Sequence, residues 1–110
     1  MIYRSKAPLR IGLAGGGTDV SPYSDLYGGA ILNATISLYA HANIEPLAEN
    51  AIIFQALDLG SDERYELTDQ LPVEGKFQLH KGVYNRLKKQ YGIPSNGFRL
   101  STFVDAPPGS

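Results

Sequence analysis

Apolar and polar residues alternate with a period of two along much of this chain, which indicates β-strands. The clearest run covers residues 36–44, where every second position is apolar, as in a strand with one buried face. Residues 98–104 repeat the pattern, and the run ends at Asp105. Further apolar segments predict strands at residues 2–4, 9–13, 30–34, 52–57 and 64–67. Pro8 lacks a backbone donor, so we expect an edge or a bend where it stands.

The period changes to that of a helix between Phe77 and Tyr91. The predicted inner face carries His80, Val83, Tyr84, Leu87 and Tyr91, and the remaining face carries Lys81, Arg86, Lys88 and Lys89. Gly92 is expected to end this helix, and Pro94 prevents its resumption. A helical turn is also expected at residues 22–26, inside a loop that is rich in Gly, Ser, Pro and Asp.

The order of these segments predicts an α+β fold, with a mixed or antiparallel sheet and one clear helix. A single helix leaves one face of the sheet with little to cover it. After Asp105 the sequence continues as Ala-Pro-Pro-Gly-Ser, which is turn chemistry directly after a strand. We therefore expect residues 1–110 to be an incomplete domain, the N-terminal segment of a longer protein.

Composition narrows the class of protein. The 110 residues suit one small domain, and the apolar fraction of 43% suits a packed core. A net charge of -1 gives no electrostatic case for binding nucleic acid or an anionic membrane. The absence of cysteine excludes disulfides and thiolate metal sites. With neither a membrane-length apolar run nor a signal peptide, a cytoplasmic protein is expected, and nothing indicates its oligomeric state.

Candidate chemistry is concentrated in residues 7–19. A short apolar strand carrying Arg10 leads into three consecutive glycines, followed by Thr18 and Asp19. Glycines allow positive φ angles and close approach of another molecule. Polar groups placed directly after such a turn indicate a site that binds a small ligand.

Two phosphate-binding motifs do not fit this loop. Gly12 and Gly17 have the spacing of a Walker A loop, but no lysine follows, and Asp19 would repel phosphates. A dinucleotide fingerprint fails as well, because the sixth position counted from Gly15 is Val20. A carboxylate suits a neutral, hydroxyl-rich ligand such as a sugar, with charge-assisted bonds of about 1.5–3 kcal/mol each. The alternative is a plain tight turn in which Asp19 caps the following short helix.

In combination, residues 7–11, 15–19 and 27–30 resemble the first motif of the GHMP kinases, a superfamily that includes galactokinase, homoserine kinase, mevalonate kinase and phosphomevalonate kinase. The Gly-Gly-Gly-Thr-Asp form and residues 28–34 are most similar to D-glycero-D-manno-heptose 7-phosphate kinases, and next to the kinase part of fucokinases. The resemblance implies the N-terminal, ATP-binding domain of such a kinase.

The resemblance also implies roles. It implies ATP-dependent phosphorylation of the anomeric hydroxyl of a sugar, with heptose 7-phosphate as the acceptor, and Arg10 as the catalytic cation beside that hydroxyl. The implied substrate-binding residues are Gly16, Gly17, Thr18, Asp19, Gly29 and Asn33. Gly16 and Gly17 stand where galactokinases carry Glu-His, which implies a roomier pocket. For Asn33 an ordinary asparagine at a strand end is an equal alternative.

The end of the chain resembles the opening of the second GHMP motif, which wraps the phosphates of ATP. Pro108, Gly109 and Ser110 are therefore implied as nucleotide-binding residues, whereas the alternative is an ordinary Pro-Pro turn. Mg²⁺ is expected with ATP, but its ligands and the catalytic acid or base are expected beyond Ser110, so no metal ligand is predicted here. The 110 residues alone are expected to be inactive. Other candidates are a fucokinase-like or galactokinase-like enzyme and a non-catalytic polyol-binding module.

Overall fold

The protein is described here from a computed structural model, which covers residues 1–92, 94 and 96–107. Within these residues five strands and two helices follow one another along the chain. They are β1 (Tyr3–Ala14), α1 (Tyr23–Tyr27), β2 (Leu32–Pro46), β3 (Ala51–Ala56), β4 (Ser61–Glu66), α2 (Gln78–Tyr91) and β5 (Phe98–Val104).

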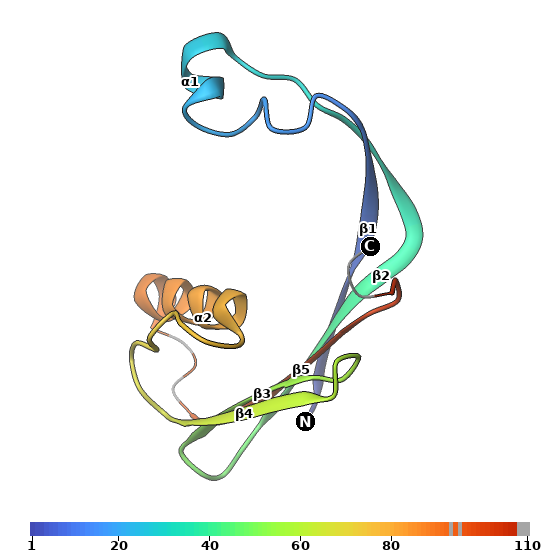
Figure 1. The fold of residues 1–110 in the computed structure, drawn as a ribbon. Coiled ribbons are helices and arrows are strands. Elements are labelled where there is room, and N and C mark those ends of the chain that lie inside the picture. The colour runs from blue at the N-terminus through green and yellow to red at the C-terminus, as the bar shows by residue number, and fades with distance from the viewer. Residues whose placement is uncertain (93, 95, 108–110) are drawn as a thin grey trace.

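The five strands form one sheet in the order β1-β2-β5-β3-β4 (Figure 1). Neighbouring strands are antiparallel, except for β3 and β5, which run parallel. The sheet is therefore mixed, and the predicted α+β class is confirmed. β1 and β2 extend beyond the other three strands, because β5 pairs only with the second half of β2, from Ala40 to Pro46.

The N-terminal part of the sheet differs from the predicted one in its segmentation. Residues 2–4 and 9–13 belong to one strand, β1, in which Pro8 lies at the edge of the sheet and the ladder is irregular between Pro8 and Arg10. The bend expected at Pro8 is thus a bulge inside a continuous strand. Residues 32–46 are likewise one strand, and the buried strand predicted at residues 30–34 is wrong, because Ile31 is 40% and Leu32 60% exposed.

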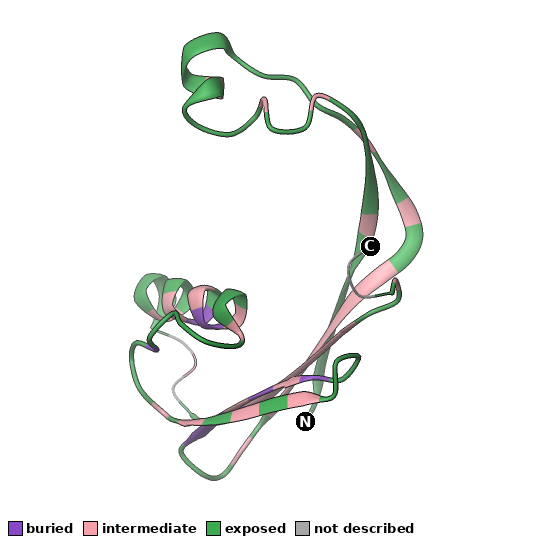
Figure 2. Cartoon of the chain, in the orientation of Figure 1, coloured by how far each residue is buried: buried purple, intermediate pink, exposed green. Residues whose placement is uncertain are grey.

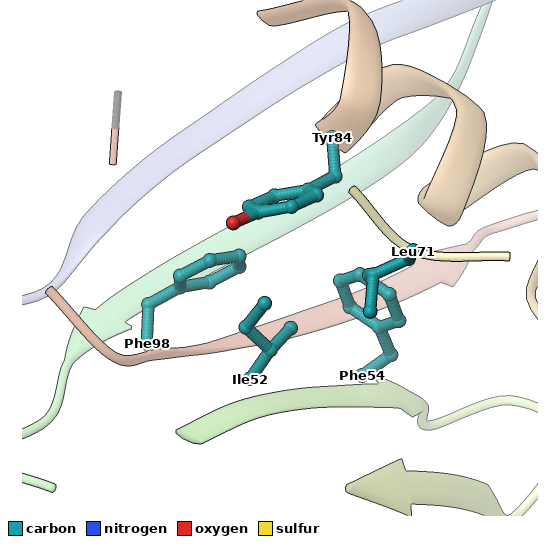
Figure 3. Close-up of a cluster of buried hydrophobic side chains, with 5 residues drawn as sticks. All are labelled: Ile52, Phe54, Leu71, Tyr84 and Phe98. Atoms are coloured by element: carbon teal, nitrogen blue, oxygen red, sulfur yellow. The ribbon is translucent and has the colours of Figure 1, made fainter. Parts of the chain in front are cut away.

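The core lies between α2 and the β3–β5 side of the sheet. Ile52 and Phe54 of β3 are fully buried, and Leu71, Tyr84 and Phe98 complete the cluster (Figure 3). The alternating pattern of β3 and β5 places Ile52, Phe54 and Phe98 on one face of the sheet, and Tyr84 of α2 and Leu71 of the preceding connection cover them. The strand predicted at residues 52–57 and the helix predicted at residues 77–91 are confirmed within one residue at each end.

The inner face of α2 is only partly the predicted one: Tyr84 is buried and His80 packs against Phe54, as the pattern indicates, but the rest of the face differs. Lys81 and Tyr84 are buried, whereas Val83, Leu87 and Tyr91 are 50%, 41% and 61% exposed. The predicted apolar stripe therefore faces solvent over most of its length. Gly92 ends the helix as expected, in the left-handed region at φ 70°, with its N–H donating to the Lys88 carbonyl at 2.9 Å.

Polar side chains of α2 face inward because residues 67–77, the connection from β4 to α2, have backbone N–H and C=O groups that need hydrogen-bond partners. Lys81 donates to the Glu74 carbonyl at 2.6 Å, and the hydroxyl of Tyr84 donates to the carbonyl of Thr68. Asn85 accepts the N–H of Leu71 and donates to its carbonyl, both at 2.8 Å. The helix thus turns its polar side chains toward this connection, and hydrophobic periodicity alone does not report such bonds.

One helix covers only part of the sheet. The radius of gyration is 16.6 Å, against about 13 Å for a compact domain of 100 residues. β1, the first half of β2 and α1 carry no residue of the buried class (Figure 2). The expected uncovered sheet surface is therefore present. In the described part of the chain, no helix has the length and apolar character to span a membrane.

Candidate functional site

The glycine-rich loop lies at the far end of the two long strands. Residues 15–31 join β1 to β2 and include the short helix α1 (Figure 1). The turn predicted at residues 22–26 is confirmed as α1, one residue later in the chain. The loop stands apart from the core beneath α2, so its conformation depends on its own hydrogen bonds.

Thr18 makes the central link of this loop. Its hydroxyl oxygen lies 2.7 Å from the Gly15 carbonyl oxygen and 3.1 Å from the Ala30 carbonyl oxygen, and it accepts the N–H of Ala30 at 3.2 Å. The backbone N–H of Thr18 also donates to the Gly15 carbonyl at 3.1 Å. One side chain therefore holds the start of the loop against its end. A contact of Thr18 with a sugar stays a prediction, since its hydroxyl already has these partners.

Two glycines allow the loop ends to touch. A Cβ on Gly15 would lie 2.0 Å from the Ala30 carbonyl oxygen, and Gly15 also has a φ of +81°. A Cβ on Gly29 would lie 1.9 Å from the Thr18 carbonyl oxygen. Both distances are far shorter than any van der Waals contact, so these positions require glycine for packing. Gly29 was predicted as a binding residue and Gly15 had no predicted role, because spacing in the sequence does not reveal which residues a glycine contacts.

The two middle glycines have different surroundings. A Cβ on Gly16 or Gly17 would meet no atom within 4 Å among the described residues. Gly17 has a φ of +90°, which favours glycine on conformational grounds, whereas Gly16 has no such requirement. Gly16 is therefore the loop position where the missing side chain leaves open space without serving the fold of these residues.

Asp19 does not cap the short helix. The N-cap residue of α1 is Pro22, and no side-chain hydrogen bond caps this helix. Ser21 instead donates to Asp25 within the first turn. The alternative interpretation of Asp19 as a helix cap is thus wrong. Its carboxylate is exposed and takes part in no hydrogen bond or ion pair with the residues that the structure describes.

Arg10 lies on β1 directly after the bulge, opposite Thr35 of β2. Bulges redirect side chains and are frequent beside functional sites. Arg10 is exposed, and no ion pair joins it to Asp19 or to another carboxylate in the described ranges. Both charges of the candidate site are therefore available to a ligand.

The remaining predicted site residues are Asn33 and the three residues at the end of the chain. Asn33 is half-buried on β2, opposite Gly12 of β1. Pro108, Gly109 and Ser110 lie outside the described residues, so the nucleotide-binding assignment stays a prediction. No group of three or more His, Cys, Asp or Glu side chains that would hold a metal ion occurs among the residues described.

Two curated proteins are similar to this chain over nearly its whole length. The D-glycero-alpha-D-manno-heptose 7-phosphate kinase of Campylobacter jejuni is 44% identical over 107 residues, which are 97% of this chain and 32% of that protein. The L-fucokinase/L-fucose-1-P guanylyltransferase of Bacteroides fragilis is 28% identical over 105 residues, 92% of this chain and 10% of that protein. No protein-family model matches the chain.

Solved structures agree in fold. A D-glycero-D-manno-heptose 1-phosphate kinase from Bacteroides thetaiotaomicron matches with a TM-score of 0.84 and 51% identity, covering 100% of this chain and 36% of that one. The mevalonate kinase of Methanococcus jannaschii has a TM-score of 0.78 at 18% identity, with 99% and 34% covered, and shows the fold alone.

These matches confirm the resemblance to the GHMP kinases, in sequence through the heptose phosphate kinases and the fucokinase, and in fold through the solved structures. Within that superfamily its relatives are the heptose phosphate kinases, as the first motif indicated. The chain spans about a third of the length of the heptose 7-phosphate kinase that it matches. Because the coverage is partial, these matches alone do not assign an activity or a substrate to the whole protein.

Proposed function

We propose that this chain is the acceptor-binding part of an ATP-dependent sugar kinase that phosphorylates an anomeric hydroxyl, with a heptose 7-phosphate as acceptor. The observation that carries the proposal is the 44% identity to a heptose 7-phosphate kinase, which extends over 97% of the chain and includes the glycine-rich loop. The solved relative from Bacteroides thetaiotaomicron is a D-glycero-D-manno-heptose 1-phosphate kinase by name. The heptose class is thus supported by both relatives, while their names differ in the position of the phosphate.

The acceptor sugar is proposed to bind against the loop on the side of Gly16 and Asp19. The carboxylate of Asp19 accepts hydrogen bonds from sugar hydroxyls, and the open space at Gly16 admits the sugar close to the backbone. Thr18, Gly15 and Gly29 hold this part of the loop in one shape. Such preorganisation lowers the entropy that binding has to overcome.

Arg10 is proposed to stabilise the transferring group. In the reaction the anomeric oxygen bonds to the γ-phosphorus of ATP, the bond from that phosphorus to the β–γ bridging oxygen breaks, and ADP leaves. ATP supplies the phosphoryl group. A guanidinium stays protonated and stabilises the negative charge that spreads over the phosphoryl oxygens. It is no base, so the hydroxyl proton passes to a group outside the described residues.

Part of the site is expected elsewhere in the protein. Enclosed ligand pockets bury most of their ligand, but residues 15–31 line neither the hollow beside Arg4 and Lys6 nor the hollow beside Asp69 and Lys88. Since the described residues hold no metal cluster either, no Mg²⁺ ligand is assigned to them. The chemistry proposed for this chain is the positioning of the acceptor and the stabilisation of charge.

The test is a coupled assay of ADP release by the full-length protein with heptose 7-phosphate, fucose, galactose and glucuronate. We expect the highest kcat/KM with heptose 7-phosphate. Turnover with fucose alone would move the assignment to the fucokinases, to which the 28% identity of the second relative points. If calorimetry shows sugar binding but no sugar of the panel causes ADP release, the protein is a non-catalytic polyol-binding module and not a kinase.

An aspartate variant tests the acceptor site itself. Asp19→Asn keeps the shape of the side chain but removes the charge that favours hydroxyl donors. We expect weaker sugar binding in calorimetry with unchanged ATP binding. Asp25→Asn is the matched control, because Asp25 lies on α1 and bonds only to Ser21. Unchanged sugar affinity in Asp19→Asn would show that Asp19 does not bind the sugar.

A further inference from the structure

On the sheet face that points away from α2, two arginines are paired with glutamates. Arg99 of β5 donates to Glu45 of β2 at 3.1 Å. Arg64 of β4 donates to both carboxylate oxygens of Glu49, at 3.2 and 2.6 Å. These two contacts place a carboxylate beside Arg99 and beside Arg64.

The same face is unbalanced at the edge strand β1. Arg4 and Lys6 project on this face from positions two residues apart, opposite Asn43 and His41 of β2. Side chains so spaced on a strand lie about 7 Å apart. No ion pair joins either cation to a carboxylate in the described part of the chain. An anion placed between these two cations would be attracted by both.

The surroundings of these two cations form a hollow. A depression of about 510 Å³ is lined by Arg4, Ser5, Lys6, His41, Asn43 and Phe103. His41 and Phe103 form its wall, with their rings stacked at a centroid distance of 4.3 Å. His41 is held in turn by Asp105, whose Oδ1 lies 3.0 Å from the His41 Nε2. This carboxylate is thereby occupied, and no acidic residue lines the hollow.

Lys6 has one further contact, which leaves its charge available. Its ammonium group lies 4.6 Å from the centre of the Tyr39 ring. A cation over an aromatic face keeps its hydrogen-bond donors for another acceptor. The guanidinium of Arg4 offers paired donors that match two oxygens of a phosphate. Together with the amide of Asn43, the hollow presents donors of hydrogen bonds and positive charge.

We propose that this hollow is a binding site for the phosphate group of a small phosphorylated metabolite, held by Arg4 and Lys6. The volume is much larger than one phosphate requires, so an organic part fits beside the His41–Phe103 wall. The site is separate from the glycine-rich loop, because Arg4 and Arg10 stand six residues apart on one strand, about 20 Å. The proposal does not rest on the kinase function.

The test measures binding of inorganic phosphate and of glycerol 3-phosphate to the full-length protein by calorimetry at constant ionic strength. We expect saturable binding of both, tighter for the ester, and at least tenfold weaker binding in the double variant Arg4→Gln/Lys6→Gln. The matched control is Arg86→Gln/Lys89→Gln on the exposed side of α2, which removes the same charge. This control is expected to bind as the wild type does.

Three results would overturn the site. They are absence of saturable binding, equal weakening in both double variants, and tighter binding of inorganic phosphate than of the ester. Lysine and arginine on an edge strand also protect against pairing with other chains. If the double variant aggregates, Arg4→Lys keeps the charge but loses the paired donors. It is expected to bind the ester severalfold more weakly, and wild-type affinity in this variant would equally refute the proposal.

Discussion

The hydroxyl of Thr18 accepts the backbone N–H of Ala30 at 3.2 Å, across a loop whose two partners stand twelve residues apart. The same oxygen lies 2.7 Å from the Gly15 carbonyl oxygen. In a part of the fold with no buried side chain, these bonds replace a core. The glycine-rich loop is therefore a preformed element rather than a flexible linker.

Thr18→Val is expected to loosen this loop while leaving the rest of the fold intact. Valine has nearly the same shape but no hydroxyl, so Ala30 N–H loses its partner, at a cost of about 1 kcal/mol for this half-exposed site. Hydrogen–deuterium exchange should show faster exchange of peptides from residues 15–30 and unchanged exchange in α2. Thr18→Ser, which keeps the hydroxyl, serves as the control. Unchanged exchange in the valine variant would mean that the link does not hold the loop.

Alanine at Gly29 should disrupt the loop, whereas alanine at Gly16 should affect only sugar binding. The new Cβ at Gly29 would lie 1.9 Å from the Thr18 carbonyl oxygen, so the loop must open. The Cβ at Gly16 would meet nothing within 4 Å, so this variant should keep the wild-type melting temperature and raise the KM for sugar without changing that for ATP. Gly12→Ala, also without close neighbours, is the control for both. A wild-type KM for sugar in Gly16→Ala would show that the sugar does not occupy the space beside Gly16.

Residue patterns predicted most of the elements but not their contacts. The alternation in β5 and in the second half of β2 located both strands, although residues 39–45 and 99–103 are half-buried on both faces of the sheet. The extent of α2 and the burial of Tyr84 were predicted correctly, but the rest of the inner face was wrong, since Lys81 and Asn85 turn inward to bond backbone groups. The glycine motif located the candidate site. Which glycines pack and which leave space depends on contacts between residues 15–18 and 29–30, and these exist only in three dimensions.

Asn85→Leu should destabilise the protein through the connection that α2 holds. The Asn85 amide satisfies both backbone groups of Leu71, at 2.8 Å each, and Leu71 is 3% exposed. Leaving buried polar groups without partners costs about 1–3 kcal/mol each, so we expect the free energy of unfolding to fall by about 2 kcal/mol or more. Gln90→Leu on the exposed face of the same helix should change it by about 0.5 kcal/mol or less. Denaturant unfolding measures both, and equal values would contradict the assigned role.

Acidification should weaken the fold through His80. Burial against Phe54 and Phe77 lowers the pKa of His80, whose Nε2 lies 3.0 Å from the Thr102 hydroxyl. The unfolded chain, with a histidine pKa of about 6.5, therefore binds the proton first as the pH falls. The free energy of unfolding should decrease as the pH drops through about 6.5 and level off below the lowered folded-state pKa. His80→Gln should lose this part of the decrease between pH 7.5 and 5.5, and an identical pH profile in the variant would show that His80 is not responsible.

Arg10→Ala should impair turnover without affecting the fold. Arg10 is exposed and has no ion pair among the described residues, so its loss should change the free energy of unfolding by about 0.5 kcal/mol or less. Removing a group that stabilises transition-state charge typically lowers kcat by about 10² or more. Steady-state kinetics of the full-length protein with its best sugar measures this, and Arg86→Ala is the control for the loss of a surface cation. Arg10→Lys should recover part of the rate, because an ammonium keeps the charge but not the paired donors. Wild-type turnover in Arg10→Ala would place the stabilising cation elsewhere in the protein.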